Sequence, residues 1–475
     1  MPVPEPVPLA SAPSAQRACQ PIRAFPAPDQ FDPQLAAFLE QACEQLVHWL
    51  GSAALRSPLP ALSVLPDMEL PVDGLDAQAL LADLQLVMDG AYNPNHPGAL
   101  AHLDPPPVAA SIAADLVCAG LNNNLLAEEL SPSLSHLERR LCSWLAAALG
   151  MPEGSGGVAA SGGTLSNLMA LVTARRAAGL ATCGNAVVLA STDAHVSLAK
   201  AMVVMGLPPD ALIPLPVQAD GGLDPGALAD ALVTAERNGR QVIAVVATAG
   251  TTVRGAVDPL AEISAVCRRH GIWLHVDGAI GAVFALSDRH RQRVVGLELA
   301  DSITVNPQKL LGITKASSVL LLAEPQQLYS AFATGLPYME PSWGGGHGGE
   351  CGLQGTRPGE VLKLWLGLRQ LGLNGIAGVL DGAIRRRREL EARLDGDRLQ
   401  LRSGRLHLVA FTPRDFDAEQ SDAWSQRTRQ QLLAEGLMLS RPHYRGRHHL
   451  KAVLGNPHTQ SAQLEQLAAV VQASF

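Results

Sequence analysis

The chain has few aromatic residues and no long hydrophobic segment. Phe, Trp and Tyr make up only 4% of its 475 residues, so Ala, Leu and Val must fill most of a core. A membrane-spanning helix needs about 18 or more consecutive apolar residues. No apolar stretch of that length occurs, so we expect no membrane partner. With 47% hydrophobic and 17% charged residues, the composition is that of a globular protein with room for two or three domains.

Neither charge nor cysteine is concentrated in one place. The net charge is −8, and the densest basic segment, "IRRRRELEARLDGDR" from Ile384, mixes arginines with acids. This mixture predicts a solvated helix face rather than a nucleic-acid surface. The seven cysteines are odd in number and form no CxxC or His-rich pattern, which predicts neither a disulfide framework nor a metal site. We therefore expect a reducing, cytoplasmic compartment and no nucleic-acid partner.

The composition changes along the chain and suggests four segments. Residues 1–30 are rich in Pro and Ala and predict a disordered or loosely docked arm. Residues 31–105 contain helical periodicity from Asp32 to Trp49 and from Asp76 to Gly90. Residues 106–350 form a long middle segment. Residues 351–475 combine one strand-like run with amphipathic helices, which predicts a small α+β domain.

The middle segment alternates apolar strands with helices. "NAVVLAS", "QVIAVVATAG", "IWLHVDGA", "DSITVNP" and "SVLLLAE" are short runs rich in Val, Ile and Leu. Helical segments such as "DPGALADALVTAERNG" begin with Asp and Pro and end with Gly. Fully apolar strands alternating with helices predict an α/β fold with a mostly parallel sheet covered on both faces.

A segment of small residues begins one of these helices. "VAASGGTLSNLMAL" places Ser161, Gly162, Gly163 and Thr164 at the start of a helix. Small residues let an anion approach the backbone, and the free N–H groups and helix dipole favour phosphate there. An ordinary glycine-containing cap is the alternative. The segment is not a P-loop, because no Gly-Lys-Ser/Thr follows.

Three more strands end in polar residues, and sites in open parallel sheets lie outside such ends. His195 follows one strand, Asp277 ends another, and Lys309 follows a third. Taken singly, an ordinary loop histidine and a surface lysine are the simpler interpretations. Together with a phosphate cradle, however, they are the groups that pyridoxal phosphate requires. A lysine forms the Schiff base, a carboxylate keeps the pyridine nitrogen protonated, and an imidazole stacks on the ring.

The spaced motifs resemble those of the group II pyridoxal-phosphate-dependent amino acid decarboxylases, which include glutamate, aromatic, histidine and diaminobutyrate decarboxylases. The resemblance covers about residues 90–375 and rests on "SGGTLSNL", "DAHVSLAKA", "TAGTTVRGAVDP", "HVDGAIGA" and "NPQKLLG". The last differs from the family's Asn-Pro-His-Lys by a glutamine. The resemblance implies a fold-type I enzyme, similar to aspartate aminotransferase, that works as a homodimer.

The resemblance also implies roles for single residues. Lys309 would form the Schiff base, Asp277 would hold the pyridine nitrogen, and His195 would stack on the ring. The other cofactor-binding residues would be Gly163, Thr164, Thr248, Ala279 and Gln308.

Substrate-binding residues are implied by two further segments. "NHPGALAHLDPPP" resembles a segment that lines the substrate pocket and offers His102 and Asp104, for which a cap or turn is the alternative role. "GTRPGEVLKLWLG" places Arg357 where relatives have an arginine near the substrate carboxylate.

The glycine-rich loop "SWGGGHGGECG" lacks the tyrosine by which the family protonates the substrate carbon. We expect His347 to replace it, with water or His195 as the alternative donor. The predicted reaction is decarboxylation of an L-amino acid to an amine and carbon dioxide. The alternatives are oxidative deamination to an aldehyde and a degenerate paralogue with a structural or regulatory role.

Overall fold

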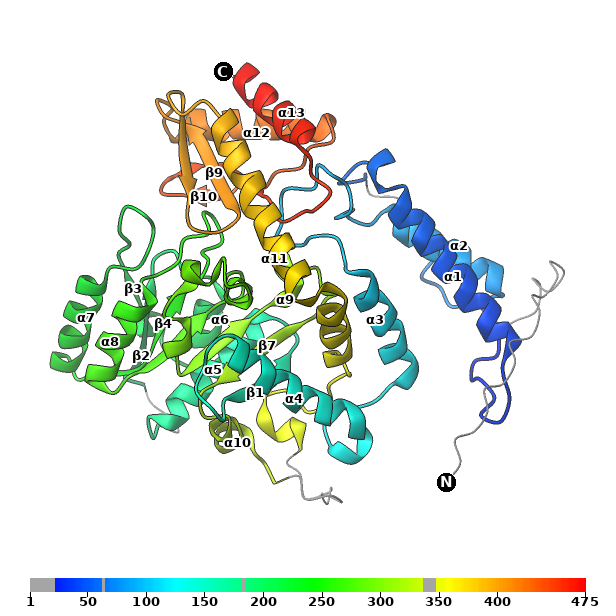
Figure 1. Cartoon of the computed structure of the whole chain (residues 1–475), viewed down its shortest axis with the longest axis horizontal. Coiled ribbons are helices and arrows are strands. Elements are labelled where there is room, and N and C mark those ends of the chain that lie inside the picture. The colour runs from blue at the N-terminus through cyan, green and yellow to red at the C-terminus, as the bar shows by residue number, and fades with distance from the viewer. Residues whose placement is uncertain (1–21, 62–64, 181–183, 336–346) are drawn as a thin grey trace. The chain divides into compact units, whose positions relative to one another are not determined.

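The computed structural model describes residues 22–61, 65–180, 184–335 and 347–475. The chain divides into two compact units, Met1–His96 and Pro97–Phe475, which are shown with the whole chain in Figure 1. Most of the predicted arm and the start of the glycine-rich loop lie outside the described residues. No helix in the described ranges is both long and apolar enough to cross a membrane.

The first unit contains two helices, α1 (Pro33–Gly51) and α2 (Ala77–Asp89), and a short turn, η1 (Ala53–Leu55). The helices coincide with the two periodic segments of the sequence because their caps are local. The Asp32 side chain accepts from the backbone N–H of Gln34 and Leu35, and Asp76 caps α2 in the same way. The Trp49 indole donates to the Met88 carbonyl at 2.8 Å and joins the helices.

The second unit is built on a seven-stranded sheet with the order β1-β7-β6-β5-β4-β2-β3. β7 runs antiparallel to both of its neighbours, and the other pairs are parallel. The strands are β1 (Gly156–Ala160), β2 (Ala186–Ser191), β3 (Leu212–Leu215), β4 (Gln241–Thr248), β5 (Trp273–Asp277), β6 (Ser302–Val305) and β7 (Ser318–Leu322). This architecture confirms the predicted α/β fold with a mostly parallel sheet.

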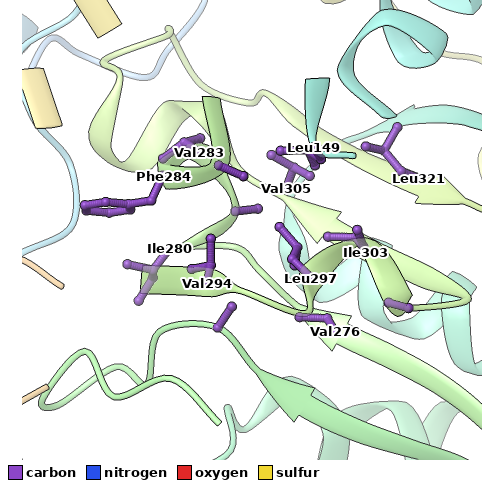
Figure 2. Packing of buried hydrophobic residues seen from close by; sticks show 14 of the residues in the cluster. Leu149, Val276, Ile280, Val283, Phe284, Val294, Leu297, Ile303, Val305 and Leu321 are labelled. Atoms are coloured by element: carbon purple, nitrogen blue, oxygen red, sulfur yellow. The ribbon is translucent and has the colours of Figure 1, made fainter. Parts of the chain in front are cut away.

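Helices cover both faces of the sheet (Figure 1). The surrounding elements are α3 (Ala109–Leu121), α4 (Pro132–Ala148), α5 (Gly163–Ala177), α6 (Ser197–Val204), α7 (Pro225–Arg237), α8 (Leu260–His270), α9 (Pro307–Leu310) and α10 (Gln326–Phe332), with short turns η2 (Glu128–Leu130) to η7 (Gly348–Cys351). Successive residues of a strand point to opposite faces of the sheet and so contribute to two different hydrophobic cores. Val188 and Val246 pack with α5 and α6, whereas Val187 and Val245 pack with α4, α7 and α8. Figure 2 shows part of the second core, including Val276, Ile303 and Leu321.

The C-terminal part begins with a long helix, α11 (Val361–Arg393), whose regular geometry is interrupted at Gly372 (φ 58°). A three-stranded antiparallel sheet has the order β12-β9-β8. The remaining elements are β8 (Leu399–Ser403), β9 (Leu408–Pro413), α12 (Ala418–Ala434), β10 (His443–Tyr444), β11 (Arg447–His448), β12 (Leu450–Val453) and α13 (Ser461–Ala473). Phe411 and Trp424 are fully buried in its core. The predicted boundary at 350 falls inside the second unit and stays a prediction.

The arginine-rich segment of α11 corrects one expectation. Instead of lying on a solvated face, Arg386 and Arg387 are only 6% and 8% exposed. The Arg386 Nε donates to the Leu454 carbonyl at 3.0 Å, and Arg387 forms an ion pair with Glu391 at 2.6 Å. Arg386 therefore ties α11 to the residue that follows β12, whereas Arg387 pairs within α11 itself. Charge alternation does not reveal that either side chain is buried.

Candidate active site

A cavity of about 480 Å³ lies where the central strands end. β4 ends at Thr248 and β5 at Asp277, both in the cavity wall, and α5 begins beside them. All predicted cofactor residues line it: Gly163, Thr164, His195, Thr248, Asp277, Ala279, Gln308 and Lys309. Segments separated by more than a hundred positions in sequence meet here because carboxyl ends of parallel strands share one edge of the sheet.

Lys309 enters the cavity from the short helix after β6. Pro307 stands in the first turn of α9, and the Lys309 N–H donates to the Asn306 carbonyl at 3.0 Å. Burial lowers the pKa of the Lys309 amine, although the charges of Asp277 and Asp104 oppose this effect. The amine is therefore neutral, and nucleophilic, more readily than that of a surface lysine.

Asp277 is held at the floor of the cavity by two donors and is only 7% exposed. Its Oδ2 accepts from the Asn167 amide at 2.9 Å, and its Oδ1 accepts from the Ala279 N–H at 3.1 Å. These two hydrogen bonds fix the orientation of the carboxylate. Asp277 is therefore placed to pair with a protonated ring nitrogen.

The start of α5 forms another part of the cavity wall. Gly162 has φ 140°, and Gly163 lies so close to the Asn306 side chain that a Cβ would be 3.0 Å from the amide. A larger residue at 163 would push against the Asn306 side chain. Glycine therefore lets the first residues of the 15-residue helix α5 lie in the cavity wall. The first N–H groups of such a helix bind phosphate.

His195 follows β2 and is half-buried in the cavity wall. Its Nδ1 accepts from the Ser197 N–H at 3.2 Å, so in the neutral ring the proton is on Nε2. Burial lowers the pKa of His195, with Asp277 opposing the shift. The preceding Asp193 accepts from the Tyr444 hydroxyl at 2.5 Å, which ties the His195 segment to the β10–β11 hairpin.

The predicted substrate residues do not line the cavity among the described residues. His102 is exposed, and Asp104 forms an ion pair with Lys315 at 3.0 Å. Asp104 is nevertheless close enough to Lys309 to oppose the lowering of its pKa. Arg357 is buried and binds Glu138, with Nη1–Oε1 and Nη2–Oε2 distances of 2.6 and 3.0 Å. This pairing does not support a role for Arg357 in binding the substrate carboxylate, which stays an untested prediction.

His347 also lies outside the set of described residues that line the cavity. It is 7% exposed, and neither ring nitrogen has a hydrogen-bond partner in the described part of the chain. The neighbouring Glu350 carboxylate accepts from the N–H groups of Thr334 and Gly335 at 2.8 Å each. In the described part of the chain His347 does not face the cavity, and its role as proton donor stays a prediction.

Sequence reasoning missed one cation beside the cavity. The Lys451 amine, on β12, donates to the carbonyl of Thr252, a cavity residue, at 3.2 Å. Burial, and secondarily the charge of Lys309, lowers the pKa of Lys451 to about 8. The sequence "HLKAVL" shows only a single lysine between apolar strand residues. It does not indicate that this lysine contacts a cavity residue 199 positions earlier in the chain.

The cavity fits pyridoxal phosphate in size and chemistry. Small-molecule sites typically have volumes of about 300–1,000 Å³, and this one has 480 Å³. It offers a helix start for the phosphate, a carboxylate for the ring nitrogen and an amine for the aldehyde. In addition, the Thr248 Oγ1 is buried and lacks a hydrogen-bond partner within the described ranges, as expected of a hydroxyl that waits for a ligand.

Comparisons with known proteins agree. A family model described as "Pyridoxal-dependent decarboxylase conserved domain" matches residues 60–411. The L-2,4-diaminobutyrate decarboxylase of Rhizobium meliloti (strain 1021) is 33% identical over 344 residues, which cover 71% of this chain and 68% of that protein. The aromatic-L-amino-acid decarboxylase of Bacillus atrophaeus is 30% identical over 328 residues, covering 68% of each chain.

A solved structure supports the fold. The crystal structure of Oryza sativa TDC with PLP and tryptamine matches with a TM-score of 0.86 and 23% identity, over 94% of this chain and 99% of that one. The family model spans well over half of the chain, and the cavity contains the groups that the cofactor needs. The chain thus belongs to the pyridoxal-dependent decarboxylases and is an amino acid carboxy-lyase with pyridoxal phosphate as its cofactor.

Proposed function

We propose that this enzyme converts an L-amino acid to the corresponding amine and carbon dioxide, with Lys309 as the covalent anchor of the cofactor. The observation that carries the proposal is the meeting of the Lys309 amine and the Asp277 carboxylate in one buried cavity at the strand ends. The family supports the class of reaction, and the geometry supports the assignment of residues.

Pyridoxal phosphate, when bound, supplies an electron sink for the bond between the substrate Cα and its carboxylate. Asp277, held by the Asn167 amide and the Ala279 N–H, would stabilise a proton on the ring nitrogen. Lys309, whose pKa burial lowers, provides a neutral amine that can attach and release the cofactor. Both groups are in place before the substrate binds, so little reorganisation is needed during the reaction.

Three further groups would orient the ligands. His195 offers its ring face to the cavity, and the Thr248 hydroxyl offers an unused hydrogen bond. Lys451 places a positive charge near the cavity. A substrate carboxylate bound there would offset the desolvation cost of the buried Lys451 ammonium. The α5 N–H groups would hold the phosphate and so fix the position of the ring.

Trapping of the cofactor tests the anchor. Borohydride reduction of the holoenzyme should attach the cofactor to the peptide that contains Lys309, as read by mass spectrometry. Lys309→Ala should lose both this adduct and turnover, whereas Lys315→Ala, a matched lysine six positions later that pairs with Asp104, should keep the adduct. Attachment at another lysine in the wild type would refute the assignment.

Product analysis decides between the two reactions that remain open. None of the tyrosines in the described ranges lines the cavity, so the source of the proton for Cα is unassigned. We expect equal amounts of amine and carbon dioxide when common and diamino L-amino acids are screened. Aldehyde, peroxide and ammonia would instead establish the oxidative reaction, and absence of any product would favour a degenerate paralogue.

The homodimer is also part of the proposal and is supported by exposed apolar residues on two helices. Leu116, Val117 and Leu121 on α3 and Trp144 on α4 are each 43–50% exposed, and both helices pack against α11. Grouped exposed apolar residues mark interfaces more often than scattered ones. We expect Trp144→Glu to shift the protein toward monomer in sedimentation, whereas Val233→Glu on α7 should not. A dimer unaffected by Trp144→Glu would place the interface elsewhere.

A further inference from the structure

Polar side chains lie beneath Asp277, where a sheet core normally has apolar ones. In β5, Trp273, His275 and Asp277 alternate with Leu274 and Val276, so the three polar-tipped residues share one face. The parallel register pairs His275 with Ser302 and Asp277 with Thr304 of β6. His275, Ser302 and Thr304 are 0% exposed, and Asn167 of α5, which covers this face, is 1% exposed.

These side chains form one continuous set of hydrogen bonds. The Trp273 Nε1 donates to the Ser302 Oγ at 2.8 Å, and this Oγ lies 2.9 Å from the His275 Nδ1. The His275 Nε2 lies 3.1 Å from the Asn167 Oδ1. The Asn167 Nδ2 donates to the Asp277 Oδ2 at 2.9 Å. The set therefore runs from Trp273, the first residue of β5, to the Asp277 carboxylate in the cavity.

The chemistry of its members gives the set a single direction. Indole can only donate, so the Ser302 oxygen accepts from Trp273 and its own proton is available for His275. Burial lowers the pKa of His275 to about 4, so the ring is neutral and accepts at Nδ1 while donating at Nε2. The Asn167 Oδ1 accepts this proton. Each donor therefore points toward Asp277.

Asn167 has no unused hydrogen-bonding capacity. Its oxygen also accepts from the Thr304 hydroxyl at 2.7 Å, and its second N–H donates to the Ser197 Oγ at 2.9 Å. Rotating the amide by 180° would set its oxygen against the Asp277 carboxylate, which is repulsive. The Ser197 N–H in turn holds the His195 ring. One amide thus fixes both the carboxylate and the segment that carries the stacking histidine.

We propose that Asn167 and His275 are positioning residues that hold and orient the Asp277 carboxylate through this one-way chain, and thereby set the protonation of the cofactor's ring nitrogen. The inference rests on the role proposed above for Asp277. The chain explains why polar residues occupy a fully buried sheet face: four donors in series end on the one group whose charge the cofactor needs. Aligned buried hydrogen bonds polarise one another and strengthen the last bond.

The test measures the ring nitrogen itself. Holoenzyme is prepared with pyridoxal phosphate labelled with 15N in the ring, and its chemical shift reports protonation. Asn167→Leu and His275→Leu should move the shift toward the unprotonated value and raise the cofactor dissociation constant about tenfold or more. His275→Gln, which retains a donor near the Nε2 position, should restore most of both. Thr173→Val, which alters another buried polar residue of α5, should leave both unchanged.

Two comparisons separate failure of this inference from failure of the proposed function. If Asp277→Asn itself leaves the shift at the wild-type value, the role of Asp277 is wrong and the chain has no target. If Asp277→Asn moves the shift but Asn167→Leu and His275→Leu do not, only the positioning chain is overturned. Should a variant fail to fold, the wild type still tests the direction: 15N-labelled histidine must show His275 protonated at Nε2, and protonation at Nδ1 alone overturns the proposal.

Discussion

Arg357 forms a buried ion pair with Glu138, and mutation can show whether this arginine stabilises the fold or binds the substrate. Both side chains are 6% exposed. The guanidinium binds both carboxylate oxygens and also donates to the Ala159 carbonyl at 3.2 Å, while Glu138 accepts from the Ala159 N–H at 2.8 Å. The pair therefore fastens the end of β1, just before the phosphate end of the cavity. A structural role predicts loss of stability on mutation, and a substrate role predicts loss of affinity.

The magnitude follows from burial. Removing one partner of a buried pair leaves the other charge without compensation and costs about 3–5 kcal/mol. Arg357→Met and Glu138→Met should each lower the free energy of unfolding by about this amount. The double variant should be less damaging than the sum of the two, because an apolar pair of similar volume leaves no buried charge. The neighbouring Arg139 pairs with Glu128 at 3.3 Å but is 45% exposed, so Arg139→Met should cost below about 1 kcal/mol.

The assay is urea unfolding monitored by tryptophan fluorescence, combined with KM for the best substrate from the screen. We expect large and non-additive losses of stability, with similar KM values in the variants that fold. If Arg357→Met instead raises KM strongly while Glu138→Met does not, and neither loses more stability than Arg139→Met, the arginine binds substrate and the structural interpretation is refuted.

Three other predictions follow from the site. Asp277→Asn should reduce kcat about a hundredfold to a thousandfold, because it removes a charge positioned for the ring nitrogen; nearly normal kcat would contradict the role. The pKa of Lys451 is lowered to about 8 from 10.5, so the unfolded chain binds more protons between these values, and wild-type stability should rise relative to Lys451→Met as pH increases from about 8 to 10. Parallel stability curves for the two proteins would show that Lys451 is not desolvated. Tyr444→Phe removes the hydrogen bond to Asp193 and should speed amide hydrogen exchange in residues 192–196, whereas the exposed Tyr329→Phe should not; equal exchange in both would mean that the hairpin does not restrain His195.

Local chemistry in the sequence was sufficient for the elements and for the cofactor end of the site. Asp32, Asp76 and Asp224 cap helices within three residues of themselves, so the starts of these helices can be read directly. Apolar strands alternating with helices predict a parallel sheet, and the sheet brings the ends of its strands together. The polar residues at those ends, Asp277 and Lys309 among them, could therefore be assigned to one site from their positions at strand ends, and the family resemblance implied their roles.

Side-chain partners that are distant in sequence could not be assigned in this way. Arg357 pairs with Glu138 across 219 residues, and the Lys451 amine reaches Thr252 across 199. Arg386 and Arg387 have the sequence pattern of solvated residues and are nevertheless buried. The partners of Arg357 and Lys451, and the burial of Arg386 and Arg387, are set by how the C-terminal part and α4 pack against the rest of the chain, and this packing depends on long-range contacts that periodicity does not encode.

The sequence by itself predicted the fold class, the cofactor and the residues that line the cavity, because caps, strand hydrophobicity and strand-end chemistry are local or follow from the geometry of a parallel sheet, and the family resemblance implied the roles of those residues. The tertiary structure decided which charged groups reach the cavity and which are held elsewhere. It also decided that Asn167, an ordinary helix residue in sequence, fills all its hydrogen bonds between Asp277, His275, Thr304 and Ser197. The physical reason is that distance and direction in space select a hydrogen-bond partner, and four separate segments, α5, α6, β5 and β6, must pack together before that distance and direction are defined.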